Sequence, residues 1–271
     1  MGYVKYPMGY MLPGSGTSGR VAMAFIGYVL AGLGVGLVFG IFGAGGSAFA
    51  TPVLALLGVP PILAVASPLP AMVPAAFNGA RRYIRAGNYD HRVARLTIMS
   101  GFPGTVIGAL TSKFVGGPNL LVLSGLMLLV IGARLVIPDR AGSEHRGHVR
   151  REQTLVVVSS TFAVGFLTGL LANGGGFLLV PLFVLVLGMT ATRAAGTSMV
   201  AVGALTIPTL LTHALLGHID WVVSAGFALG LIPASAYGAH LAQRIHPDTT
   251  RRAFGAMLVV FSIWFLYRQL T

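Results

Sequence analysis

Long apolar runs alternate with short polar loops along almost the whole chain. Residues 21–42, 120–137, 155–171 and 221–242 reach or approach the roughly 20 residues with which a helix crosses the hydrocarbon of a bilayer. Such a span must satisfy its own backbone hydrogen bonds, so each run is expected to be helical. The pattern predicts an all-α polytopic membrane protein.

A glycine-rich phrase closed by proline occurs twice, at residues 40–52 and 169–181. Other matches follow in order at a nearly constant sequence offset: Gly58 with Gly188, Gly87 with Gly217, Asp90 with Asp220, and Pro103 with Pro233. The chain therefore divides into an N-terminal tail (1–20), a first membrane repeat (21–137), a linker (138–153) and a second membrane repeat (154–271).

Each repeat is predicted to hold about five helical segments, of which the second is short and either breaks a helix or enters the membrane and turns back. The segments are 21–43, 46–58, 61–80, 93–113 and 118–137 in the first repeat, and 154–172, 175–188, 191–216, 221–243 and 249–269 in the second.

Arginines distinguish the loops of the two repeats. The loop after the third segment carries five arginines in the first repeat and none in the second. The loop after the fourth segment carries only Lys113 in the first repeat, but three arginines in the second. Cytoplasmic loops hold the excess of Lys and Arg. This predicts inverted repeats with a cytoplasmic linker, although Lys5 and Arg20 lie on a tail that is then external.

Composition narrows the class of protein. Apolar residues make up 55% of the chain, charged residues 9%, and the mean hydropathy is +0.83, whereas soluble domains are about 25% charged. The net charge of +12 comes from loop arginines, so no nucleic-acid partner is expected. The chain has no cysteine, which excludes disulfides and thiolate metal sites. No metal and no cofactor is expected, and the cell (inner) membrane is the expected location.

The duplicated phrase is the candidate substrate site. Broken or short helices in equivalent positions of two repeats are the best sequence pointer to a transporter's binding site. Glycines let bare backbone N–H groups approach a ligand, and a helix that starts there favours an anion. The predicted substrate-binding residues are Gly45, Gly46, Ser47, Thr51, Ser67, Asn173, Gly174, Gly175, Gly176, Thr197 and Ser198.

The lack of acidic residues within the predicted spans supports an anion as the substrate. All six carboxylates lie in loops or at span ends, and none is placed within a span to bind Na⁺ or to repel an anion. Glycine has another use, because it lets membrane helices pack closely. The four-residue spacing of Gly32, Gly36 and Gly40 favours that use.

Several single residues allow two interpretations. Asn173 either caps the following helix or contacts the ligand. His213 and His240 each either carry a coupling proton or are hydrogen-bonded packing residues. Arg193 either extends to the membrane interface or attracts the anion. Asp90 and Asp220 are expected to cap the helices that follow them.

At these residues the chain resembles the sulfite exporter TauE/SafE family of membrane permeases. The resemblance covers nearly all of residues 21–270 and depends on both phrases with Pro52 and Pro181, on Ser67 and Thr197-Ser198, and on the turns 87–90 and 217–220. Ser47 departs from the family's usual third glycine. The resemblance implies transport of sulfite, sulfonates or related sulfur-containing organic anions.

The function predicted is a permease or exporter for a small sulfur-containing anion, working by alternating access. An anion channel and a carrier of another organic carboxylate remain alternatives, whereas a membrane-embedded enzyme would need a clustered nucleophile and base that no span offers. The expected partners are the anionic substrate and the bilayer, and a homodimer is left open.

Overall fold

The fold is a bundle of helices. The computed structural model describes residues 18–43, 47–111, 126, 129–130, 132–137, 154–171, 176–215 and 217–270, and every regular element in these residues is a helix. The elements are α1 (Ser18–Ile41), α2 (Ser47–Leu56), α3 (Pro61–Ala66), α4 (Leu69–Arg85), α5 (His91–Thr111), α7 (Thr154–Leu171), α8 (Gly176–Leu185), α9 (Ala191–Leu215), α10 (Trp221–Ala242) and α11 (Pro247–Leu270).

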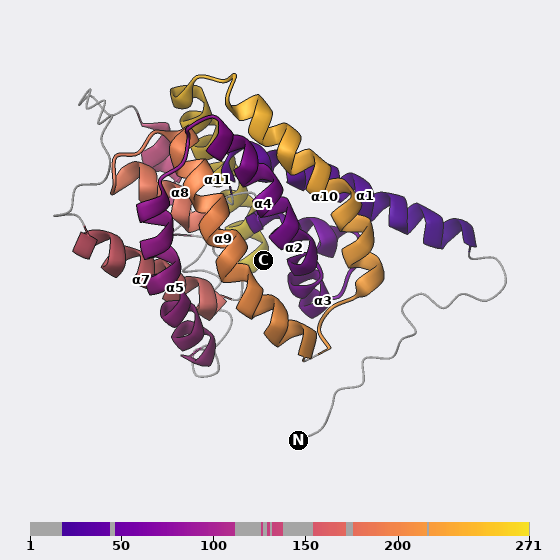
Figure 1. Cartoon of the computed structure of the whole chain (residues 1–271). Helices are drawn as coiled ribbons and strands as arrows, with labels where there is room; N and C mark the ends of the chain where they lie inside the picture. The colour runs from indigo at the N-terminus through magenta and orange to yellow at the C-terminus, as the bar shows by residue number, and fades with distance from the viewer. Residues whose placement is uncertain are drawn as a thin grey trace.

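The first segment of each half packs against the fourth segment of the other half. Helix α1 of the first half lies along α10 of the second, and α7 of the second half lies along α5 of the first (Figure 1). The third segments, α4 and α9, pack against each other between these two pairs (Figure 1). Equivalent elements thus make equivalent contacts in the two halves.

Glycines bring the paired helices into backbone contact. A Cβ added to Gly36 would lie 2.7 Å from the carbonyl oxygen of Leu231, and one added to Gly32 or Gly40 would overlap a carbonyl oxygen of α10. A Cβ on Gly165 of α7 would likewise overlap the backbone of Gly101 in α5. The close-packing interpretation of the spaced glycines is confirmed.

Large apolar side chains cover the outside of the bundle. Leu30, Leu229 and Val260 are more than 60% exposed, while Phe39 and Phe227 are fully buried at the α1–α10 contact. Among the described residues, four helical stretches are long and apolar enough to cross a membrane: Ala22–Ile41, Leu63–Arg85 (the end of α3 together with α4), Ala191–Leu215 and Trp221–Ala242. In its described residues the protein is an all-helical membrane protein, as predicted.

The predicted third segment of the first half is wrong in detail. Residues 61–80 were expected to form one helix, but the chain forms α3 and then α4, which continues to Arg85. The interruption falls at Ser67 and Pro68, because Pro68 and Pro70 have no N–H to donate to the preceding turn. The equivalent α9 is a single helix of 25 residues.

The glycine-rich phrases separate a long helix from a short one. Helix α1 ends at Ile41 and the ten-residue α2 begins at Ser47, while α7 ends at Leu171 and the ten-residue α8 begins at Gly176. Leu57, just after α2, lies 3.6 Å from the Cβ position of Gly27 in α1. Helix α2 therefore runs back along α1 after the first phrase.

Candidate functional site

Gly43, the fourth residue of the first glycine-rich phrase, lies against the start of α9. Gly43 has a φ of 71°, and a Cβ there would lie 2.7 Å from both the Cα of Ala195 and the Oγ of Ser198. A side chain is therefore excluded twice, by backbone strain and by space. Ala195 and Ser198 are the fifth and eighth residues of α9, so Gly43 lies roughly 6–10 Å along the axis from the start of that helix.

Tyr83 fixes the end of α1 at this place. Its hydroxyl lies 2.8 Å from the carbonyl oxygen of Gly40 and 3.1 Å from that of Ile41, and the side chain is fully buried. The last carbonyls of a helix have no partner within it. Tyr83 supplies that partner and so positions the chain that enters the phrase.

Thr197 links the two halves of the chain. Its side chain is fully buried, and its Oγ1 accepts a hydrogen bond of 3.1 Å from the backbone N–H of Asp90 while donating one of 2.8 Å to the carbonyl oxygen of Arg193. The neighbouring Ser198 donates to the carbonyl oxygen of Ala195 at 2.9 Å. Both predicted site residues thus lie on α9 beside the first phrase.

Ser67, between α3 and α4, makes the equivalent link to the turn before α10. Its Oγ accepts a hydrogen bond of 3.0 Å from the backbone N–H of Asp220. The offset that relates the repeats matches Ser67 with Thr197 and Asp220 with Asp90. In each bond, therefore, the hydroxyl comes from one half and the aspartate N–H from the other. We call Asp90–Thr197 and Ser67–Asp220 the two cross-half hydrogen bonds.

The two aspartates cap helices, as predicted. Asp90 Oδ1 accepts from the N–H groups of Arg92 and Val93, and Asp220 Oδ1 accepts from those of Val222 and Val223. Asp90 has an additional partner, because its Oδ2 lies 3.0 Å from Nη2 of Arg193. Burial, and after it the Asp90 carboxylate, raises the pKa of the adjacent Tyr89, which keeps that hydroxyl neutral.

Several predicted site residues fall on the phrases themselves. Gly45, Gly46, Asn173, Gly174 and Gly175 lie outside the described residues. Ser47 is the first residue of α2, Gly176 is the first residue of α8, and Thr51 is half-buried in α2. Their roles in binding stay predictions.

His213 lies in the last turn of α9. Its Nδ1 is 3.3 Å from Nδ1 of His218, and the rings are tilted by 55°. The described part of the chain holds no group of three or more His, Asp or Glu side chains that could bind a metal ion. Proton coupling through His213 stays a prediction.

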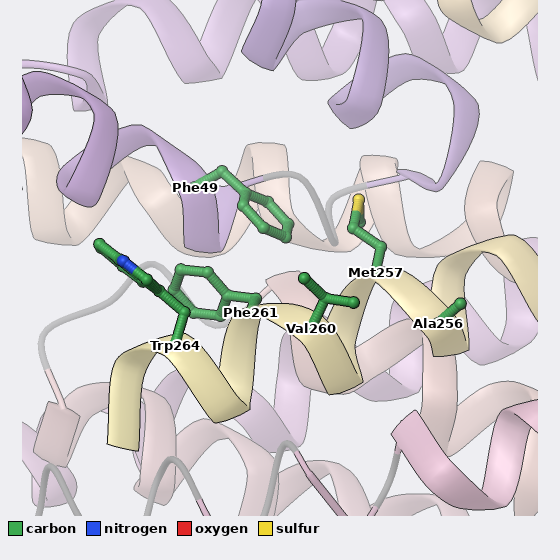
Figure 2. Close-up of a pocket in the computed structure, with 6 residues that line it drawn as sticks. All are labelled: Phe49, Ala256, Met257, Val260, Phe261 and Trp264. Carbon is green, nitrogen blue, oxygen red and sulfur yellow. The ribbon is translucent and has the colours of Figure 1, made fainter. Parts of the chain in front are cut away.

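An apolar groove of about 430 Å³ lies between α2 and α11. Figure 2 shows Phe49 of α2 facing the side chains of α11, and its ring centroid is 4.8 Å from that of Phe261. The other lining residues are Ala256, Met257, Val260 and Trp264. Apart from the indole N–H, no lining side chain can donate a hydrogen bond, so this groove is not suited to an anion.

Sequence reasoning missed Tyr83 and the partner of Arg193. Tyr83 stands among arginines at the end of α4, where an aromatic residue is usually an interface anchor. The sequence held a signal, because Tyr83 and His213 occupy equivalent positions of the two repeats. In the structure, the backbone carbonyl of Tyr83 accepts a hydrogen bond from the N–H of Asn88, and that of His213 accepts one from the N–H of His218.

Comparison with known proteins shows which family the chain belongs to. Residues 28–265 match the family described as sulfite exporter TauE/SafE. The chain is 30% identical over 244 residues to a probable membrane transporter protein of Xylella fastidiosa (strain 9a5c), which covers 87% of this chain and 92% of that protein. It is 27% identical over 247 residues to the probable membrane transporter protein YunE of Bacillus subtilis (strain 168), covering 83% and 89%.

No solved structure matches the chain. The relatives are named as probable membrane transporter proteins, and together with the family match they confirm the expectation of a transporter rather than an enzyme. Because the family match extends over most of the sequence, the chain belongs to the sulfite exporter TauE/SafE family of membrane transporters.

Proposed function

We propose that the protein is a secondary transporter that moves a small sulfur-containing anion, such as sulfite or an organosulfonate, across the cell (inner) membrane. Transport proceeds by alternating access between two inverted repeats, residues 21–137 and 154–271. The glycine-rich phrases supply the backbone N–H groups that hold the anion. The family's description as sulfite exporters supports the substrate class.

Helix directions support the inversion. Helix α1 leads into Gly43, which lies against the start of α9, and α9 is bonded near its start to Asp90, just before α5. Near the start of α5, Arg92 Nη2 donates to Thr154 Oγ1, in the first residue of α7, at 2.6 Å. Helix α1 thus ends in the region where its equivalent α7 begins, so the two run in opposite directions.

Arginines indicate which end is cytoplasmic. Arg92 contacts Thr154 after the linker, and Arg251 Nη2 donates to the carbonyl oxygen of Ile137 before it, at 3.3 Å. We call this end of the bundle the linker end. Arg81, Arg82, Arg85 and Arg95 accompany Arg92 in the α4–α5 region. The excess of arginine favours a cytoplasmic position for the linker end.

The observation that carries the proposal is the pair of cross-half hydrogen bonds. Asp90–Thr197 joins the halves at the linker end, and Ser67–Asp220 joins them beside the end of α9, which is the opposite end of the bundle. A carrier needs two regions that open in turn, and equivalent bonds at opposite ends of inverted repeats fit that need. A channel has no such need, so this observation favours a carrier.

Ligand-induced stabilisation tests the proposal. The purified protein is heated in detergent with sulfite, sulfate, sulfoacetate, taurine or small carboxylates, since a ligand that binds the native state raises the melting temperature. We expect sulfite or a sulfonate to raise it in a saturable, concentration-dependent way. Stabilisation by carboxylates alone would contradict the substrate class, and no stabilisation by any anion would contradict anion binding.

A further inference from the structure

Arg193 holds a charge at the boundary between the candidate site and the linker end. It is the third residue of α9, its side chain is 23% exposed, and it forms an ion pair of 3.0 Å with the almost fully buried carboxylate of Asp90. The equivalent position in the first half, at the offset that relates Asp220 to Asp90, is Leu63. The cation therefore belongs to one end of the transporter only.

The ion pair leaves part of the guanidinium unused. Arg193 Nη2 binds Asp90, whereas its Nε is buried and has no hydrogen-bond partner among the described residues. A guanidinium has five N–H donors in a fork that fits two oxygens of one oxyanion. A buried N–H without an acceptor is costly, and an oxyanion bound beside it would remove that cost.

The position of Arg193 adds to this. Thr197 and Ser198 follow it by four and five residues on the same helix, and Ser198 lies against Gly43 of the first phrase. Along the axis of α9, Arg193 is therefore within about two helical turns of Gly43, which contacts Ala195 and Ser198 on another face of that helix.

We propose that Arg193 takes the anionic substrate at the linker end, exchanging its Asp90 partner for an oxygen of the substrate. This inference depends on the proposed transport of an anion. Asp90 neutralises the guanidinium when no anion is bound, so it acts as an internal competitor of the substrate. Arginine suits this role better than lysine, because its planar fork binds an oxyanion through two parallel hydrogen bonds.

Calorimetric titration of the purified full-length chain with sodium sulfite, and then with sodium sulfoacetate, tests the inference. We expect Arg193→Gln to raise the Kd about tenfold or more and Arg193→Lys to raise it about threefold, because a charge-assisted bidentate contact is lost or weakened. Asp90→Asn should lower the Kd about threefold, since it removes the competitor while the Asn oxygen still caps α5.

Arg95→Gln is the matched control. Arg95 is an exposed arginine near the same end with no ion pair among the described residues, so its loss should leave the Kd unchanged if the effect is specific to Arg193. A purely structural ion pair predicts a different pattern, in which Arg193→Gln and Asp90→Asn change binding in the same direction. The opposite signs of the two effects are therefore the decisive readout.

The outcomes separate the two proposals. Anion binding by the wild-type protein that Arg193→Gln and Asp90→Asn leave unchanged, or weaken alike, overturns the role of Arg193 and leaves the proposed function standing. Failure of the wild-type protein to bind either anion overturns both. Should Arg193→Gln not fold, Arg193→Lys and Asp90→Asn decide, and an unaltered Kd in Asp90→Asn contradicts the inference.

Discussion

The backbone N–H of Asp220 donates a 3.0 Å hydrogen bond to Ser67 Oγ, across 153 residues of sequence. The same bond recurs between Asp90 and Thr197 with the halves exchanged. Each aspartate also caps the helix that follows it. Matching residues of the two halves thus make matching contacts between the halves. Substituting these residues tests what the contacts contribute.

Removing either hydroxyl of the cross-half hydrogen bonds should destabilise the protein. Ser67→Ala and Thr197→Val each leave a backbone N–H without its acceptor, which costs about 1–3 kcal/mol. Chemical unfolding in detergent measures the change. Ser159→Ala is the control, since that exposed hydroxyl donates to carbonyl oxygens of its own helix, those of Leu155 and Val156. Variants as stable as the control would show that the hydrogen bonds contribute nothing.

Glycine packing of α1 on α10 predicts two opposite results within one helix. Gly36→Ala places a Cβ 2.7 Å from the Leu231 carbonyl oxygen, so it should destabilise the protein by about 1–3 kcal/mol. Gly34→Ala meets no atom within 4 Å and should be neutral or stabilising by up to about 1 kcal/mol. Thermal unfolding of the two variants compares them directly, and equal melting temperatures would contradict the close contact.

Tyr83→Phe should loosen the entrance to the first phrase. The variant keeps the ring but leaves the carbonyl oxygens of Gly40 and Ile41 without the hydroxyl, at a cost of about 1–3 kcal/mol. We expect a lower melting temperature and weaker sulfite binding. Tyr237→Phe is the control, because Tyr237 is 63% exposed. Unchanged sulfite binding by Tyr83→Phe would show that the Tyr83 hydroxyl does not contribute to the site.

Substitution within the second phrase should abolish transport without unfolding the protein. Gly175→Leu adds a bulky side chain to the phrase that is proposed to hold the anion, and Asn173→Ala removes a polar side chain that precedes its glycines in the sequence. Uptake into proteoliposomes should be lost in the first variant and weakened in the second. Gly34→Leu is the matched control, because its side chain enters open space on α1. Wild-type flux in Gly175→Leu would remove the case for a site there.

How far the sequence predicts this molecule depends on the kind of interaction. The Gly-x-x-Asp turns that end at Asp90 and Asp220 predicted the capping roles of these two residues, because caps and turns depend on neighbouring residues. The partners of Ser67 and Thr197 could not be predicted. A buried hydroxyl can bond its own helix, another helix or a ligand, and only the packing of α4 against α9 and the turns selects among these.

Arg193 shows the same limit more sharply. Its sequence position allowed the membrane interface or the anion, and the structure adds a third partner, Asp90, which is 103 residues away. The interruption at Ser67 and Pro68 was missed for another reason. Apolar periodicity continues through it, and only the missing N–H groups of Pro68 and Pro70 indicate it. Local chemistry was thus predictable, whereas cross-half pairing was not.

Counterflow in proteoliposomes tests the central claim, that the protein is an alternating-access carrier of a small sulfur-containing anion, most directly. Vesicles are loaded with unlabelled sulfite, and the initial uptake of labelled sulfite is measured across a range of outside concentrations. The account predicts saturable uptake that is faster in loaded vesicles than in empty ones. Uptake that rises linearly with concentration and is the same in loaded and empty vesicles would contradict it.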